Sequence, residues 1–138
     1  MVEVTAAISQ LAKWKGYIEF VSIGANDLSQ YLTAVDRNKP RVASKYDHLH
    51  PAVLAEIARV VEAAGRLELP VSVCGEMASD PEAVVMLVGM GIRKLSMSAT
   101  HLPKIKWLIR AINSSYAREL FQSSCNSCDS LDIRKITS

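Results

Sequence analysis

Several side chains that can hold a metal ion or move a proton stand at the ends of short apolar runs in this sequence. Asn26 and Asp27 follow one run, Cys74 ends another, and Glu3 lies in a third. Carboxylate oxygens suit Mg²⁺, which keeps several waters and is often completed by a substrate phosphate. A thiol can transfer a proton or act as a nucleophile. The residue types therefore allow metal-assisted chemistry beside a reactive thiol.

Each of these residues also has a plain structural interpretation. Asp27 is equally suited to cap a helix, and Glu3 to be an exposed acid near the chain end. Arg37 can bind a phosphate or carboxylate through two parallel hydrogen bonds, or simply end a helix in solvent. A cysteine at the end of a buried strand, such as Cys74, is usually inert. Taken singly, each residue favours the structural interpretation.

Apolar periodicity predicts that strands and helices alternate along the chain. Short β-branched runs predict strands at residues 1–4, 18–23, 70–74 and 94–98. Helical spacing predicts helices at residues 6–17, 28–35, 50–65, 82–91, 102–112 and 114–122. His50 and Asp80 are predicted to begin two of these helices, and Gly16 and Gly65 to end two. The repeated strand–helix order predicts an α/β fold with a parallel sheet.

The predicted order of elements brings the chemical residues together. Loops at the carboxyl ends of parallel strands converge, and sites form there. Glu3, Asn26-Asp27 and Cys74 fall on three successive strand ends. This shared location favours Glu3 and Asp27 as ligands of a divalent cation, with Arg37 reaching an anion. It leaves Cys74 open between an inert thiol and a general acid.

Length and composition exclude several classes of protein. The chain has 138 residues, enough for one domain, of which 49% are hydrophobic and 22% charged. A net charge of +2 predicts no charge-driven binding to nucleic acid or membranes. No apolar run spans a bilayer and no secretory leader opens the chain. Three cysteines, Cys74, Cys125 and Cys128, then predict reduced thiols in the cytoplasm.

Two further motifs receive a structural interpretation. Cys125 and Cys128 have the spacing of a redox or zinc pair, but no second ligand pair lies nearby in the sequence, so we interpret them as free thiols. His48 and His50 are separated by one residue just before Pro51, and no metal role is expected for this pair. His101 precedes Leu102-Pro103 at the start of a predicted helix and is interpreted as structural.

Three long stretches closely resemble the phosphoenolpyruvate-binding domain of enzyme I, the phosphoenolpyruvate–protein phosphotransferase of the bacterial phosphotransferase system. They are SIGANDLSQYLTAVDR (22–37), VCGEMASDPEAVVMLVGMGI (73–92) and KLSMSATHLPKIKWLIR (94–110). The resemblance runs from Met1 to about Arg110, and the sequence after Asn113 matches poorly. The stretch DRNKPRVASKYDHLHPAVL (36–54) is similar to the nitrogen-branch form of that enzyme.

The resemblance implies a role for each candidate residue. Glu3 and Asp27 fall on the family's magnesium ligands, while Asn26 and Arg37 fall on residues that contact the phosphoryl group. Cys74 falls on the thiol that protonates the enolate carbon to release pyruvate. Mg²⁺ is the implied cofactor, and a histidine-containing phosphocarrier protein is the implied partner of the full-length enzyme, which is expected to form a homodimer.

The family's catalytic domain is a (β/α)₈ barrel, so the resemblance implies that residues 1–112 are its C-terminal half, four βα units. Residues 113–138 are expected to form a helix and a flexible tail. The phosphorylatable histidine domain and the arginines of the other half are missing, so the chain alone is expected to be inactive and its open edges to favour self-association. Two alternatives stay open: a non-catalytic dimerisation module, and a piece of a pyruvate phosphate dikinase or phosphoenolpyruvate synthase.

Overall fold

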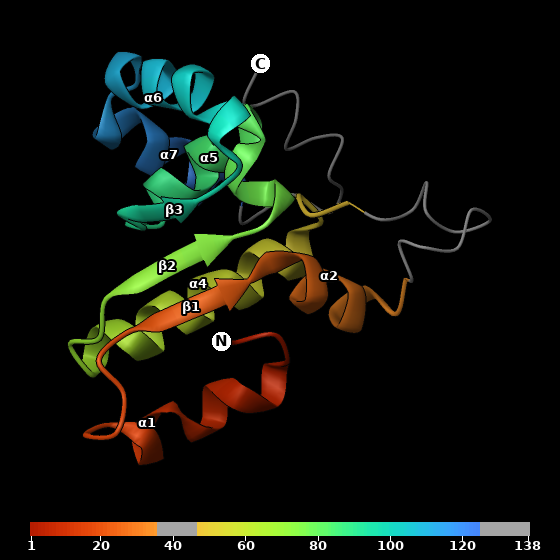
Figure 1. Ribbon diagram of the computed structural model, residues 1–138, viewed down its shortest axis with the longest axis vertical. Helices are drawn as coiled ribbons and strands as arrows, with labels where there is room; N and C mark the ends of the chain where they lie inside the picture. Colours follow the sequence, from red (N-terminus) through yellow and green to blue (C-terminus); the bar gives the residue numbers. More distant parts are fainter. Residues whose placement is uncertain (36–46, 125–138) are drawn as a thin grey trace.

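A computed structural model describes residues 1–35 and 47–124, in which one parallel sheet carries the fold (Figure 1). Its strands lie in chain order: β1 (Val21–Gly24), β2 (Val71–Cys74) and β3 (Lys94–Ser96). A single parallel bridge joins Val2 to Ile23 of β1. Each connection returns the chain to the same end of the sheet, as parallel strands require. The α/β class and the parallel sheet predicted from the sequence are confirmed.

The prediction of a strand over residues 1–4 is wrong in its length, because only Val2 pairs with β1. Val2 donates its N–H to the Ser22 carbonyl at 2.7 Å and accepts from the Gly24 N–H at 2.9 Å, and no longer ladder forms within the described chain. The chain turns at Val4 into a 3₁₀ helix, η1 (Thr5–Gln10), which leads into the short α1 (Leu11–Trp14). Within the described residues nothing pairs with the outer edge of Val2, so a longer strand there would gain hydrogen bonds on one side only.

The other predicted helices are present with small shifts of their ends. They are α2 (Ala25–Thr33), α4 (Pro51–Arg66), α5 (Pro81–Gly89), α6 (Leu102–Ala111) and α7 (Ser114–Ser124), with short 3₁₀ turns η2 (Glu76–Ser79) and η3 (Ala99–His101). Across residues 1–35 and 47–124, none of the helices has the length and apolar character to cross a membrane.

The predicted helix starts are confirmed, and one predicted helix end is wrong. The His50 ring accepts from the Ala52 N–H at 3.2 Å, and the Asp80 carboxylate accepts from the Glu82 N–H at 3.1 Å. Helix α4 passes through Gly65 and ends at Arg66. After the helix, Glu68 adopts the left-handed conformation, with φ +57°. The residue with the helix-terminating conformation therefore lies three positions after Gly65.

The hydrophobic core lies between the sheet and α4, which runs behind β1 and β2 in Figure 1. Ile23 and Val73 are fully buried and belong to the same core cluster as the fully buried Val53 and Ile57 of α4. Because side chains alternate along a strand, Ser22 and Cys74 lie on the opposite face. The face of these strands away from α4 therefore carries hydroxyls and a thiol.

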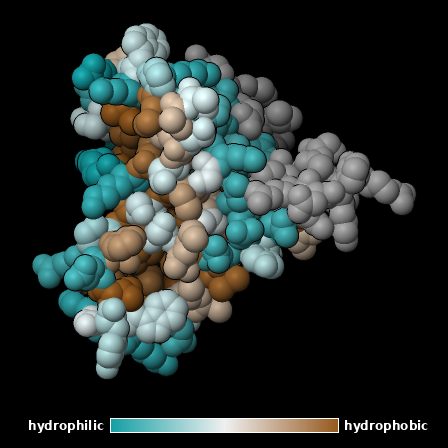
Figure 2. All heavy atoms as spheres, in the orientation of Figure 1, coloured by the Kyte–Doolittle hydropathy of each residue, from teal (hydrophilic) through white to brown (hydrophobic). Residues whose placement is uncertain are grey.

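Uncovered apolar surface instead lies between α6 and β3, where Figure 2 shows hydrophobic residues gathered on the visible face. A groove of about 530 Å³ is lined there by Val88, Ile92, Leu95, Met97, Leu102, Ile105, Ile109 and Ile112, with Arg93, Lys106, Arg110 and Ser114. Ile105 is buried in it, whereas Leu102 is 51% exposed. Only part of the apolar stripe of α6 is thus covered within the described chain.

Candidate functional site

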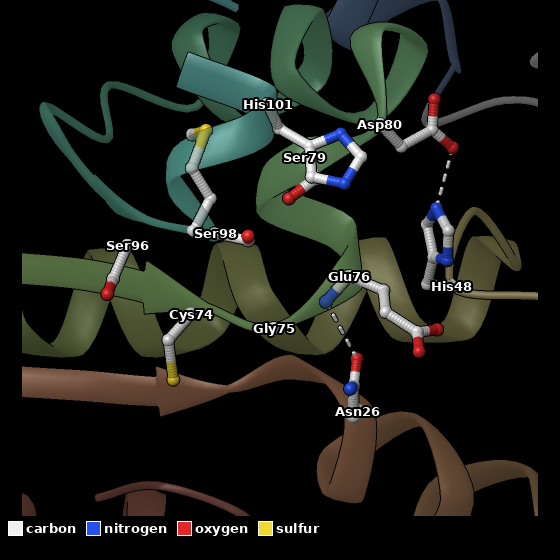
Figure 3. Close-up of a pocket in the computed structure, with 11 residues that line it drawn as sticks. Asn26, His48, Cys74, Gly75, Glu76, Ser79, Asp80, Ser96, Ser98 and His101 are labelled. Carbon is white, nitrogen blue, oxygen red and sulfur yellow. Dashed lines mark hydrogen bonds and ion pairs between the residues drawn. The ribbon is translucent and has the colours of Figure 1, made fainter.

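A pocket of about 650 Å³ opens at the carboxyl ends of the strands (Figure 3). Asn26 reaches it from the residues after β1, Cys74 from the end of β2, and Ser98 from the chain after β3. The other lining residues are His48, Gly75, Glu76, Ser79, Asp80, Ser96, Met97 and His101. The parallel sheet thus brings Asn26 and Cys74, far apart in sequence, into one concave surface.

Asn26 connects the ends of two strands. Its side-chain oxygen accepts a hydrogen bond from the Glu76 N–H at 3.2 Å, which Figure 3 marks with a dashed line. Gly75 makes the close approach possible: its φ is +105°, and a β-carbon there would lie 2.8 Å from the Asn26 side-chain oxygen. The amide is therefore held by the chain that directly follows β2, in a position that a residue larger than glycine at 75 would disturb.

The interpretation of Asp27 as a helix cap is wrong. The cap position of α2 is Gly24, no described side chain caps this helix, and Asp27 lies in its first turn. Asp27 is half-buried, and among residues 1–35 and 47–124 its carboxylate has no hydrogen bond or ion pair. A partly buried carboxylate that lacks a structural partner in the described chain, and lies at a strand end, is available to a ligand.

Glu3 lies against the end of β1. A β-carbon on Gly24 would be 2.8 Å from Glu3 Cγ and 3.2 Å from its Oε1, so the absence of a side chain at residue 24 lets the carboxylate rest over the strand. The Val2–Ile23 bridge fixes this approach, because Glu3 directly follows Val2. Glu3 and Asp27 thus both flank the last residue of β1, although neither is among the described residues lining the pocket.

Glu3 and Asp27, the two residues predicted to bind magnesium, are both half-buried. Mg²⁺ commonly uses one or two carboxylates and completes its octahedron with water and substrate oxygens. The described residues hold no group of three or more His, Cys, Asp or Glu placed to bind a metal ion. A closed, all-protein metal cage is therefore not formed by this part of the chain, whereas a two-carboxylate site remains compatible with the half-buried Glu3 and Asp27.

The Cys74 thiol is half-buried and points toward β1 (Figure 3). Its sulfur lies 3.4 Å from the Ile23 carbonyl oxygen, 3.5 Å from the Met1 sulfur and 3.9 Å from the Ser22 hydroxyl. An inert core cysteine would be surrounded by apolar carbon. This thiol instead has polar neighbours and lines an open pocket, so a ligand bound in the pocket can reach it.

Sequence reasoning missed part of the pocket. His48 Nε2 lies 2.7 Å from Asp80 Oδ2, so the segment before α4 is tied to the first turn of α5 (Figure 3). The other Asp80 oxygen caps α5, as predicted. His101, interpreted from the sequence as structural, is exposed and lines the same pocket as His48. Only the strand–helix order, which places 48 and 80 at the same end of the sheet, could have indicated this pairing.

Three residues singled out from the sequence lie outside the described ranges. Arg37 is in the segment 36–46, and Cys125 and Cys128 are in the segment 125–138. The predictions for these three residues stay predictions.

Residues 1–114 match the family described as "PEP-utilising enzyme, PEP-binding domain". The chain belongs to this family. It is 46% identical over 106 residues to a "Phosphoenolpyruvate-protein phosphotransferase" of Cupriavidus necator, which covers 77% of this chain and 18% of that protein. It is 41% identical over 120 residues to a protein of the same name from Haloferax volcanii, covering 87% of this chain and 21% of that protein.

A third relative aligns with nearly the whole chain. The chain is 40% identical over 134 residues to a Salmonella typhimurium protein named "Phosphoenolpyruvate-dependent phosphotransferase system", covering 97% of this chain and 18% of that protein. The family match ends at residue 114, close to the limit near Arg110 that the sequence predicted, while the alignment with this relative covers more of the chain. All three relatives carry names of phosphotransferases or of the phosphotransferase system. The chain spans about a fifth of the length of these curated relatives.

Proposed function

We propose that this chain forms part of the active site of a phosphoenolpyruvate–protein phosphotransferase, an enzyme that moves the phosphoryl group of phosphoenolpyruvate to a protein histidine and on to a phosphocarrier protein. The observation that carries the proposal is the convergence of Asn26 and Cys74 in one pocket at the strand ends, in a chain of the PEP-binding family. A cytoplasmic location, a homodimer and the nitrogen-branch subtype are further expectations from the resemblance.

We further propose that the fold is the C-terminal half of a (β/α)₈ barrel. The sequential order of the Val2 bridge, β1, β2 and β3 supports this, since a barrel adds parallel strands one by one in the same direction. The strand β3 pairs on one side only within the described residues. A further strand of a longer protein would pair there, and its helix would cover the groove beside α6.

The proposed mechanism assigns one task to each residue. Glu3 and Asp27 would hold Mg²⁺, which when bound would supply positive charge for the phosphoryl and enolate oxygens. Asn26 would donate a side-chain N–H to the phosphate, whose oxygens only accept, while its side-chain oxygen accepts from the Glu76 N–H. The described residues that line the pocket include no lysine or arginine. Arg37 is therefore proposed to supply the positive charge that the phosphoryl group needs. Cys74 protonates the carbon of the enolate.

Metal-dependent binding of phosphoenolpyruvate to this chain tests the proposal. Mn²⁺ in place of Mg²⁺ broadens the nuclear magnetic resonance signals of nearby amides, so weak binding is readable. We expect Mn²⁺ with phosphoenolpyruvate to broaden the amides of Gly24, Asn26 and Asp27 at sub-stoichiometric metal. Asp27→Asn and Glu3→Gln should each remove this broadening, because each deletes one of two ligands.

Glu19→Gln is the matched control for that titration. Glu19 is exposed and lies just before β1, at the opposite end of the strand from Asp27. Its replacement changes the net charge equally and should leave the broadening intact. Broadening that survives in Asp27→Asn would contradict the proposed metal site. Broadening that is the same without phosphoenolpyruvate and is spread over all surface acids would contradict it as well.

Cys74→Ala is expected to separate two steps of the reaction. The test uses a hybrid in which residues 1–114 replace the matching domain of the Cupriavidus necator relative. Formation of pyruvate should fall by about 10²- to 10⁴-fold, the usual contribution of a positioned general acid. Phosphoryl exchange between phosphoenolpyruvate and the enzyme should fall much less, since it needs no proton at carbon.

The chain alone is the negative control for this experiment. It should phosphorylate nothing, because the acceptor histidine of the family belongs to a domain that these residues do not include. An equal loss of exchange and of pyruvate formation in the Cys74→Ala hybrid would indicate a packing role for the thiol.

A further inference from the structure

The three neighbours of the Cys74 sulfur differ in what they can do. The Ile23 carbonyl and the Met1 thioether are acceptors, so each can receive the S–H but neither can hydrogen-bond to a sulfur that has lost its proton. The Ser22 hydroxyl, 3.9 Å from the sulfur, is a donor. Among the neighbours that the structure gives this thiol, Ser22 is thus the one suited to a thiolate.

The strand register explains why the hydroxyl reaches the sulfur. Cys74 pairs with Gly24 across β1 and β2, and Ser22 lies two residues before Gly24 on the same face. Gly24 has no side chain, so no β-carbon stands directly opposite Cys74 on β1. Ser72 occupies the equivalent position on β2 itself, but its hydroxyl donates to the Val21 carbonyl at 3.4 Å. Two neighbouring serines on one face therefore have different partners.

We propose that Ser22 is a positioning residue for Cys74, orienting the thiol and stabilising the thiolate that remains after proton transfer. The proposal rests on the proposed function of Cys74 as a general acid. In that step the S–H bond breaks and its proton bonds to the methylene carbon of enolpyruvate. The carbon–carbon π electrons form the new C–H bond, and the enolate oxygen becomes the ketone oxygen of pyruvate. Sulfur keeps the S–H electron pair and accepts from the Ser22 hydroxyl until water returns a proton.

The rate of Cys74 alkylation by iodoacetamide tests this role without phosphoenolpyruvate, because only the thiolate reacts. The full chain is used with Cys125→Ser and Cys128→Ser, so that Cys74 alone reports. In Ser22→Ala the rate at neutral pH should fall at least about threefold, as expected for losing a long hydrogen bond to a charged group. The pH profile of the rate should move to higher pH. Ser22→Thr, which keeps a hydroxyl, should restore both.

Ser72→Ala is the matched control and should leave the rate and its pH profile unchanged. Ser22→Gly provides a second variant without a hydroxyl if the alanine variant does not fold. An unchanged pH profile in the hydroxyl-free variants, or the same shift in Ser72→Ala, would overturn the proposal. A shift specific to Ser22 alongside normal pyruvate formation in the Cys74→Ala hybrid would instead leave the hydrogen bond standing and overturn the catalytic role of Cys74.

Discussion

Alanine in place of Gly89 is expected to destabilise the protein by about 2 kcal/mol, although alanine favours helices. Gly89 ends α5, where that helix packs against α7. A β-carbon at residue 89 would lie 2.3 Å from the Ala117 carbonyl oxygen and 2.9 Å from Phe121 Cβ. The nearest obstacle is backbone, which cannot rotate away as a flexible side chain would. The helices must therefore separate, at the usual cost of overpacking, about 1–3 kcal/mol.

Urea denaturation and amide hydrogen exchange measure this effect together. The unfolding midpoint should fall, and amides of α7 should lose protection first, since α7 lies at the end of the described chain and its packing on α5 is what the methyl group disturbs. Figure 1 shows α7 lying beside α5. Exchange that stays unchanged in α7 would mean that the two helices can adjust without separating.

Gly65→Ala is the control with the opposite expected sign. Gly65 lies near the end of α4 and is exposed. Apart from its chain neighbours and the backbone of its own helix, no described atom would lie within 4 Å of a β-carbon added there. Alanine there should stabilise the protein by about 0.5–1 kcal/mol, because it restricts the unfolded chain and favours the helix. The same substitution in two helices of one chain thus separates packing from propensity.

Local periodicity was sufficient to predict most of the architecture. In α4, Leu54 and Ile57 recur at helical spacing and are buried as expected, and Pro51 lies in its first turn. In β2 a short apolar run forms a strand that pairs on both sides. Such elements are predictable because the same residues that set the period also supply the buried face.

The errors lie where tertiary contacts decide. Residues 1–4 have strand-like composition, yet only Val2 finds a partner within the described chain, because a strand needs a neighbour that composition does not reveal. Gly65 has the conformational freedom to end a helix, but the left-handed residue is Glu68. A glycine permits a helix end without requiring one.

The candidate site was predictable to the level of strand ends, but not of side-chain partners. The parallel sheet was enough to place Asn26 and Cys74 in one region. The hydrogen bond from the Glu76 N–H to Asn26, the pairing of His48 with Asp80 and the contact of Ser22 with Cys74 depend on loop conformation and strand register. A shift of register by one residue would send Ser22 to the core face.

Asp27→Ala in the hybrid enzyme is expected to lower magnesium-dependent turnover by about 10²- to 10⁴-fold, which corresponds to the several kcal/mol that a metal ion contributes to charge stabilisation. Folding should change little. Within the described residues the Asp27 side chain caps no helix and has no hydrogen bond or ion pair, so its removal leaves no buried group there unpaired. Steady-state rates measured across magnesium concentrations, with circular dichroism of each variant, separate the two effects.

Two comparisons make this last test specific. Asp27→Asn keeps the volume and removes the charge, and it should lose activity like the alanine variant, because a neutral amide is a much poorer magnesium ligand. Glu19→Gln removes the same charge at the other end of β1 and should keep nearly normal turnover. If high magnesium restores Asp27→Ala fully, the carboxylate contributes affinity alone and Glu3 with the substrate suffices to orient the metal. Near-normal turnover of Asp27→Ala at an ordinary magnesium concentration would contradict the assignment of this carboxylate as a ligand. Asn26 would then be the only described residue directly after β1 with a proposed role at the phosphate.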